Sequence, residues 1–154
     1  MDVSIRPYAP DDRDAVLSLA ARLTTATAPW RDPVAVRRTV TAWVAEALDV
    51  VDPETGPVWV ALDGDAVVGI VHAGTRVHWS GEVDAYVGEL VVAPTHERTG
   101  TGRRLMARAE AWAREQGHTR LTLETGAANT AARSFYAALG YVTEEVVLTR
   151  DLGG

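Results

Sequence analysis

Two glycines one residue apart, Gly100 and Gly102, precede an amphipathic run that has the period of a helix. The first amide groups of a helix have no partner inside the helix, and together with the positive end of the helix dipole they can bind a phosphate. Glycine leaves the space that such a ligand needs to reach the backbone. Four arginines cluster around the pair: Arg98, Arg103, Arg104 and Arg108. The stretch therefore predicts an anion site, although a tight strand-to-helix turn would also explain the glycines.

The spacing of these glycines excludes two common phosphate loops. A Walker loop needs a glycine, four residues and then Gly-Lys-Ser or Gly-Lys-Thr, and no such run occurs. A dinucleotide fingerprint would place a third glycine at position 105, where the chain has Leu105. What remains is a predicted strand that ends at Val92, a glycine loop and a helix.

Two polar side chains further along the chain could serve one groove. Asn129 and Tyr136 are seven residues apart in the segment NTAARSFYAALG, which the pattern predicts as a helix with Asn129 at its N-cap and Gly140 just past its end. Seven residues make nearly two helical turns, so both side chains lie on one face, roughly 10 Å apart along the axis. Packing of the Tyr136 ring on Ala132 and Leu139 is the competing interpretation.

The elements that must position these residues follow from the hydrophobic periodicity. Strands are predicted at residues 3–8, 58–62, 66–74, 83–93 and 120–125, and the segment 141–152 is predicted as one strand or a very short pair. Helices are predicted at 9–23, at 34–48, from Gly102 to the C-cap signal Gly117, and at 129–140. A strand, a helix and a strand in this order normally form a parallel, right-handed unit. We therefore predict a single α/β domain, residues 1–154, whose mixed central sheet of about six or seven strands is flanked by about four α-helices.

Composition narrows the class of protein. The chain has 154 residues, of which 47% are hydrophobic and 23% charged, enough for one sizeable core. It has no cysteine, so disulfides and thiolate catalysis are excluded and any thiol must arrive with a ligand. The sequence has neither a run long enough to span a membrane nor a secretory leader. We therefore predict a cytoplasmic protein with no membrane partner.

The charge balance bears on partners and metals. Fifteen basic against 21 acidic residues give a formal net charge of -6, which argues against a nucleic-acid partner and mildly favours cationic substrates. The histidines at 72, 78, 96 and 118 have no metal-ligand spacing, and no cysteine is present to complete a site. No metal is predicted, and these histidines are interpreted as surface or strand residues.

Two stretches together point to a family. The segments ELVVAPTHERTGTGRRLM, residues 89–106, and LETGAANTAARSFYAALGY, residues 123–141, resemble the GCN5-related N-acetyltransferase (GNAT) superfamily. In that family a strand of form Leu-x-Val-x-Pro leads into a loop of form Gln/Arg-x-x-Gly-x-Gly/Ala and then a helix. A later strand is followed by Asn, an alanine-rich turn and Phe-Tyr-x-x-Leu-Gly-Phe or -Tyr. The resemblance implies a GNAT-like fold.

The resemblance also implies acetyl-coenzyme A as co-substrate and a set of contacts to it. It implies backbone pairing of the pantetheine arm with Leu90, Val91 and Val92, a pyrophosphate wrapped by Arg98, Thr99, Gly100, Thr101, Gly102 and Arg103, and a contact from Asn129. It places Tyr136 near the sulfur, where the side chain is the candidate general acid. It assigns the oxyanion to a backbone N–H at Leu90 or Val91. One residue departs from the family pattern: Glu97 stands where Gln or Arg is usual. We expect it to point away or to be compensated by Arg98 and Arg103.

Two glutamates are candidates for the general base. A primary amine of the lysine type has a pKa near 10.4, so a carboxylate, directly or through water, would help to remove its proton. Glu124 lies five residues before Asn129, the spacing at which ribosomal-protein N-terminal acetyltransferases of this superfamily carry a glutamate proposed as base. Glu89 lies on the strand that would hold the cofactor and alternates with Leu90, so it could face the substrate. Each is equally well explained as a solvated strand residue.

Three functions remain open. The leading hypothesis is an N-acetyltransferase that moves an acetyl group from acetyl-coenzyme A to a primary amine, on a small molecule, by direct transfer in a ternary complex. The second is acetylation of a protein N-terminus or lysine. The third is a non-catalytic module that binds acyl-coenzyme A. The acceptor, the acyl group and the oligomeric state, for which a homodimer is one candidate, are left undetermined.

Overall fold

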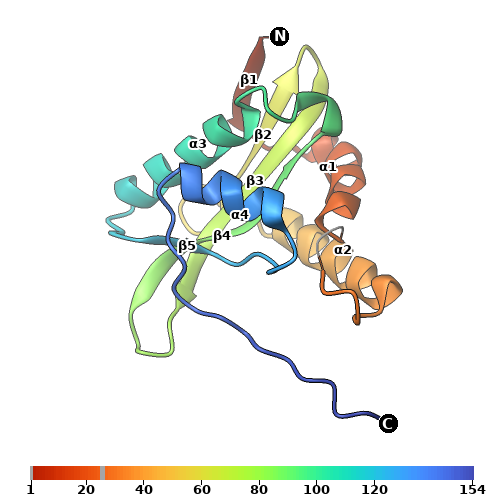
Figure 1. The fold of residues 1–154 in the computed structure, drawn as a ribbon. Coiled ribbons are helices and arrows are strands. Elements are labelled where there is room, and N and C mark those ends of the chain that lie inside the picture. The colour runs from red at the N-terminus through yellow and green to blue at the C-terminus, as the bar shows by residue number, and fades with distance from the viewer. Residues whose placement is uncertain (1, 25–26) are drawn as a thin grey trace.

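The computed structural model describes residues 2–24 and 27–154. Its single sheet has five strands in the order β1-β2-β3-β4-β5 (Figure 1). The strands are β1 Val3–Pro7, β2 Val58–Asp63, β3 Ala66–Val77, β4 Val83–Val92 and β5 Leu121–Leu123. The first four pair antiparallel and β5 lies parallel to β4. The mixed sheet and the parallel unit at its end confirm the predicted α/β class.

Four α-helices accompany the sheet in the described part of the chain. They are α1 Arg13–Ala20, α2 Pro33–Asp49, α3 Thr101–Glu115 and α4 Thr130–Ala138. Short 3-10 turns lie at η1 Pro10–Asp12, η2 Ala21–Thr24 and η3 Pro94–His96. None of the described helices is both long and apolar enough to cross a bilayer.

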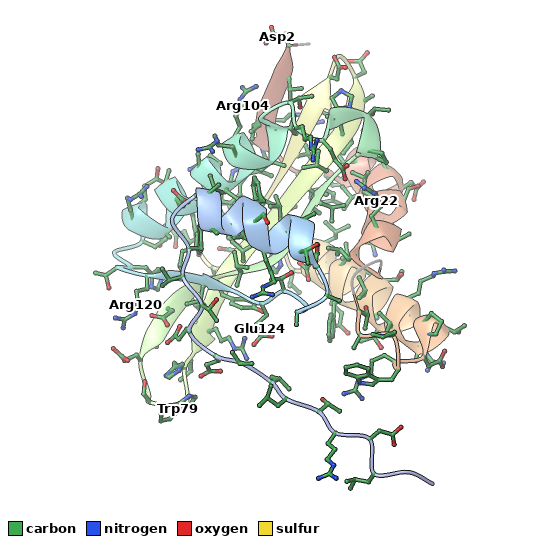
Figure 2. The ribbon with its side chains drawn as sticks, viewed as in Figure 1. Asp2, Arg22, Trp79, Arg104, Arg120 and Glu124 are labelled. Carbon is green, nitrogen blue, oxygen red and sulfur yellow. The ribbon has the colours of Figure 1, made fainter. Side chains whose placement is uncertain are left out.

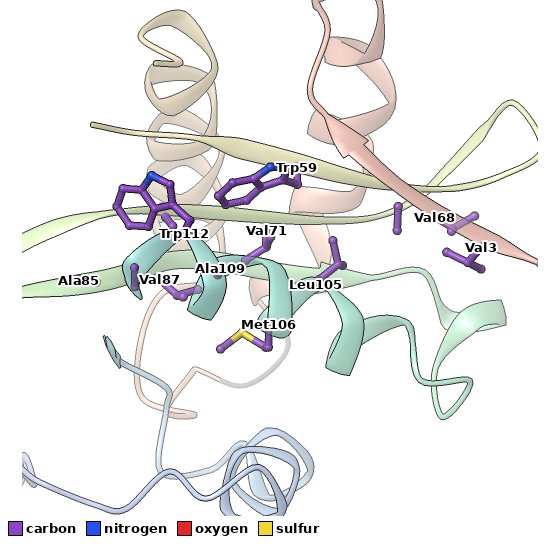
Figure 3. Close-up of a cluster of buried hydrophobic side chains, with 13 residues drawn as sticks. Val3, Trp59, Val68, Val71, Ala85, Val87, Leu105, Met106, Ala109 and Trp112 are labelled. Carbon is purple, nitrogen blue, oxygen red and sulfur yellow. The ribbon is translucent and has the colours of Figure 1, made fainter. Parts of the chain in front are cut away.

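The helices cover the two faces of the sheet and so create two cores. Successive side chains of a strand point to opposite faces. On one face Val60, Ile70 and Val91 pack with residues of α1 and α2, among them Val16 and Val44. On the other face the buried stripe of α3 meets the sheet, and α4 packs against the edge of that core. Figure 3 shows this second cluster, in which α3 lays Leu105, Met106, Ala109 and Trp112 against the strands.

The predicted strand at 141–152 is wrong: residues 141–154 form no helix or strand. The sheet therefore has five strands and not six or seven. The apolar side chains of this segment are exposed, with Val142, Val147 and Leu148 each at 88% or more. Alternating apolar residues favour a strand only where a neighbour supplies backbone partners, and here the segment runs away from the body of the molecule (Figure 1). It is tied down by side chains instead: Tyr141 donates to Glu110 over 3.0 Å and Trp79 donates to Glu145 over 2.8 Å.

Candidate functional site

The outer edge of β4 is open along its last five residues. β5 pairs only with residues 85–87 of β4, whereas β4 continues to Val92 with β3 on its other side. A register shift between His72 and Ala73 of β3 leaves Gly88 of β4 as the extra residue of a bulge at this point. The strands β4 and β5 therefore separate at the bulge, and among the described residues no strand pairs with the outer edge of the stretch 88–92.

The hydrogen-bond alternation decides which peptide groups this open edge presents. Ala93 N–H donates to Val68 carbonyl oxygen across the β3–β4 ladder over 2.8 Å. In an antiparallel ladder alternate residues face the partner, so Val91 also faces β3 while Leu90 and Val92 face outward. The Val92 carbonyl accepts a hydrogen bond from Arg22, which agrees with that direction. Of the two residues predicted to offer an outward N–H, Leu90 has the required direction and Val91 does not.

The glycine loop follows this edge directly. Arg98 and Gly100 both have positive φ angles, 59° and 87°, and only glycine adopts such a conformation without steric cost. Arg104 N–H donates to Gly100 carbonyl oxygen over 3.0 Å and is the first helical bond of α3. The amides of residues 101–103 therefore precede the helical ladder, as the sequence predicted for an anion site. In the part of the chain that the structure describes, no atom beyond the two neighbouring residues lies within 4 Å of the position of a Cβ on Gly100.

Gly102 marks the point where three elements meet. A Cβ on Gly102 would lie 3.2 Å from the Phe135 ring of α4 and 3.7 Å from a methyl of Val92 at the end of β4. This glycine therefore allows α4 to approach the loop closely, which is a packing requirement that the spacing pattern did not reveal. Through this contact the open edge of β4, the loop and α4 lie side by side.

The four arginines around the glycines have different partners. Arg98 and Arg103 have exposed side chains. Arg104 donates to the carbonyl of Val3 on β1 (Figure 2). Arg108 lies over the Trp59 ring, with its guanidinium carbon 4.7 Å from the ring centre. Positive charge at the loop itself thus comes from the first two.

Glu97 is compensated by a residue that the sequence did not predict. Arg22, on η2, places Nη2 2.5 Å from Glu97 Oε1 and also donates to the carbonyl of Val92 (Figure 2). Arg22, and not Arg98 or Arg103 as expected, pairs with the negative charge of Glu97. The two partners are 75 positions apart in the chain, and no motif joins them.

Asn129 and Tyr136 both lie on α4 as predicted. Asn129 caps the helix, its Oδ1 accepting from the Ala132 N–H over 3.1 Å. The Tyr136 ring packs edge-on against Phe135 and Tyr141, with centres 5.1 and 5.7 Å away. Burial raises the pKa of Tyr136 to about 12, so the phenol keeps its proton throughout the neutral range.

The two candidate glutamates lie in different surroundings. The Glu89 side chain is 12% exposed, and its Oε2 lies 2.8 Å from Nδ1 of His72. The Glu124 side chain, just beyond β5 (Figure 2), is 67% exposed and pairs with Arg76 over 2.5 Å. This bond raises the pKa of Arg76, whose guanidinium also lies 5.1 Å from the centre of the Tyr86 ring. The Glu89 carboxylate is thus mostly shielded from solvent, whereas the charge of the Glu124 carboxylate is neutralised by Arg76.

A hollow of about 560 Å³ lies between the C-terminal half of α2 and β3. Its lining residues are Trp43, Glu46, Ala47, Asp49, Val50 and His72. Asp49 also pairs with Arg13 over 2.8 Å. The hollow is therefore mostly apolar, with Trp43 as its aromatic wall and Glu46 as its one carboxylate not paired with an arginine among the described residues, and His72 joins it to Glu89. The sequence predicted only a surface or strand residue at His72. Its alternation with Ile70, which places both side chains on one face of the sheet, was the sequence feature that could have indicated its position.

Comparison with known proteins places these features in a family. The sequence profile of the acetyltransferase (GNAT) family matches residues 20–141. Over 87 residues, 56% of this chain and 39% of the relative, the chain is 33% identical to N-acetyltransferase 8F1 of Rattus norvegicus. Over 71 residues, 46% of this chain and 49% of the relative, it is 35% identical to aminoglycoside N(6')-acetyltransferase type 1 of Serratia marcescens. The matches span less than half the length of either relative.

Solved structures agree on the fold. AAC(6')-Iy, in complex with the bisubstrate analog CoA-S-monomethyl-acetylneamine, has a TM-score of 0.73 at 18% identity, covering 98% of this chain and 99% of that one. At that identity the likeness concerns the fold alone. Because the family profile extends from the last residue of α1 to Tyr141, three residues beyond α4, the chain belongs to the GNAT family of acetyltransferases.

Proposed function

We propose that this protein is an N-acetyltransferase that moves an acetyl group from acetyl-coenzyme A to a primary amine of a small, cationic molecule, by direct transfer in a ternary complex. The observation that carries the proposal is the open edge of β4, which meets the glycine loop and α4 at Gly102. One relative supports the acceptor class: the Serratia marcescens protein, 35% identical over 71 residues, is named for aminoglycosides.

The residues at the open edge fit a coenzyme A molecule. An unpaired strand edge offers backbone partners to the amides of a pantetheine arm. The amides of residues 101–103, with the exposed Arg98 and Arg103, suit a pyrophosphate. Asn129 uses Oδ1 for its helix cap, which leaves its NH₂ group for a ligand carbonyl. The cofactor would supply an activated thioester, and with it the thiol that a chain without cysteine lacks.

We assign the acetyl oxygen to the N–H of Leu90. Negative charge develops on that oxygen in the transition state, and a fixed donor aimed at it lowers the barrier. Leu90 N–H faces the open edge by the ladder alternation, whereas Val91 N–H is committed to β3. The bulge at Gly88 holds the strand apart from β5 at that level.

Glu89 is the base that we propose, in preference to Glu124. The acceptor amine must lose a proton before it attacks, and a carboxylate accepts that proton best when no cation neutralises it. Glu124 is held by Arg76, whereas the partner of Glu89 is an imidazole. Glu89 also lies at the bulge, next to Leu90, where the thioester would be.

Tyr136 is the group that we propose to assist the leaving sulfur. Its pKa of about 12 lies above the value of about 8.5 for an ordinary thiol. The phenol therefore gives up its proton less readily than a thiol does. We propose that it stabilises the departing sulfur chiefly by donating an O–H hydrogen bond.

The test of the function is thiol release from acetyl-coenzyme A over a panel of amines. The panel contains aminoglycosides, simple diamines, lysine-containing peptides and a blank without amine. We expect release with cationic small molecules, because the hollow beside α2 carries the Glu46 carboxylate next to the Trp43 ring. Release with peptides alone would favour a protein acetyltransferase. Binding of coenzyme A without release on any amine would favour a non-catalytic module.

Replacing Glu97 with glutamine should leave coenzyme A binding unchanged or strengthen it by up to about fivefold. The change removes one negative charge beside the loop, and an exposed ion pair has an energy of at most about 1 kcal/mol. Calorimetric titration with coenzyme A measures the effect, which should shrink as salt is added. Glu115→Gln is the control, since Glu115 pairs with Arg108 at the far end of α3. A marked loss of affinity in Glu97→Gln would mean that the carboxylate holds Arg22 in a position that the ligand needs.

A further inference from the structure

We propose that His72 is the positioning residue for the base: its imidazole fixes the Glu89 carboxylate at the β4 bulge so that one oxygen is held and the other is left for the acceptor amine. The inference rests on the proposed function, in which Glu89 removes the amine's proton. It adds a residue of β3 that lies outside the family motifs quoted above.

The strand register brings the two side chains together. His72 and Glu89 are directly opposed in the β3–β4 ladder, with Nδ1 and Oε2 2.8 Å apart. Both lie on the face covered by α1 and α2, two residues from Ile70 and Val91 respectively. Their side chains are 23% and 12% exposed. A sheltered pair keeps its geometry better than an exposed one, because water competes less for its hydrogen bond.

The bulge glycine leaves room for the imidazole. A Cβ on Gly88 would lie 2.8 Å from Nδ1 of His72, the atom that bonds to Glu89, and 3.4 Å from its Cε1. No side chain could occupy that position without displacing the ring. The bulge residue Gly88 therefore allows the His72–Glu89 contact, because it has no side chain that would displace the imidazole ring.

The bond determines which atoms hold protons. An ionised carboxylate can only accept, so Nδ1 of His72 carries the hydrogen and donates it to Oε2 of Glu89. Oε1 then remains as the oxygen able to take a proton. When an acceptor ammonium reacts, one of its N–H bonds breaks and an O–H bond forms at Oε1. The amine becomes neutral, and His72 keeps its own proton and its bond to Oε2.

Two substitutions at His72 test the role by kinetics. His72→Phe keeps a ring but removes the donor, and the loss of carboxylate alignment should lower kcat by up to about 100-fold. His72→Gln keeps an N–H donor and should recover part of the rate. KM for acetyl-coenzyme A should stay unchanged in both. His78→Phe is the matched control, because His78 also pairs with a glutamate, Glu145 at 3.2 Å, but at the exposed hairpin end.

A double variant separates positioning from a general structural effect. If His72 acts through Glu89, then His72→Phe should cost almost nothing further in a Glu89→Gln background. An acceptor amine that is already unprotonated at the assay pH should be less sensitive to His72→Phe, since it needs no base before it attacks and loses its proton only after the C–N bond has formed. The proposal would be contradicted if the kcat losses of the two single variants multiplied in the double variant. It would also be contradicted if His72→Phe lowered kcat as much with the unprotonated amine as with a protonated one.

The pairing has a readout that does not depend on turnover. The ¹⁵N chemical shifts of the His72 imidazole should report the Nδ1–H tautomer in the wild type and a mixture of tautomers in Glu89→Gln. An Nε2–H tautomer in the wild type would overturn the inference. So would a wild-type kcat in folded His72→Phe, while the wild type itself transfers acetyl groups. Absence of transfer by the wild type on every amine would instead contradict the proposed function.

Discussion

Glu89→Gln is expected to lower kcat for acetyl transfer by about 100- to 10,000-fold, the usual contribution of a positioned general base. Glutamine has nearly the same shape as glutamate and can still bond to His72, either accepting through its carbonyl oxygen or donating through its NH₂ group, so the bulge should keep its geometry. What it loses is the ability to take a proton from the acceptor. Initial rates at saturating acetyl-coenzyme A and varied amine measure kcat, and calorimetry with coenzyme A checks that cofactor affinity is unchanged.

Glu124→Gln is the matched comparison. It removes a carboxylate that is 67% exposed and paired with Arg76, so kcat should stay within a few-fold of the wild type. A large loss in Glu124→Gln with a wild-type rate in Glu89→Gln would transfer the role of base to Glu124. Equal rates in all three proteins would mean that water alone removes the proton.

Tyr136→Phe is expected to lower turnover by about 10- to 100-fold, less than the 100- to 10,000-fold of a full general acid. The ring contacts with Phe135 and Tyr141 remain, so folding and cofactor affinity should change little. The smaller loss follows from the pKa of about 12, which makes the phenol a hydrogen-bond donor and not a ready source of protons. For the same reason Tyr136 should not cause a fall in rate between pH 7 and pH 10.

Tyr141→Phe is the matched control for that variant. Its hydroxyl donates to Glu110 over 3.0 Å, so its loss should lower the free energy of unfolding by about 1 kcal/mol without changing the rate. Turnover of Tyr136→Phe is measured at saturating cofactor, with coenzyme A binding measured separately. A wild-type rate would remove Tyr136 from the mechanism. A lost rate with lost binding would mean that the hydroxyl positions the cofactor.

Local patterns in the sequence were enough to predict most of the helices and strands and to identify the family. The helix that begins after Gly100 and the Asn129 cap were predicted, because each depends on residues within a few positions of one another. A helix makes its hydrogen bonds within its own segment, so period and caps describe it nearly completely. The four antiparallel strands and the parallel β5 were likewise predicted, since their apolar runs are buried between helices.

The C-terminal segment shows where such patterns fail. Residues 141–152 alternate like a strand, yet they form none and expose their apolar side chains. A strand needs backbone partners from another part of the chain, and its own residues do not indicate whether those partners exist. The number of strands in the sheet therefore depends on the tertiary structure and could not be predicted from the pattern of residues 141–152.

The same reason explains which site residues the sequence did and did not reveal. The loop glycines, Asn129 and Tyr136 were proposed as site residues from their spacing together with the family resemblance. Arg22 beside Glu97, however, comes from 75 positions away, and Arg76 beside Glu124 from 48. His72 meets Glu89 only because a bulge at Gly88 sets the register of β3 against β4. The sequence shows which residue types are available for acid–base chemistry. It does not show how they pair, and the pairing decides which carboxylate is neutralised by a cation. Those pairs are long-range contacts, which only the folded chain brings within hydrogen-bond distance.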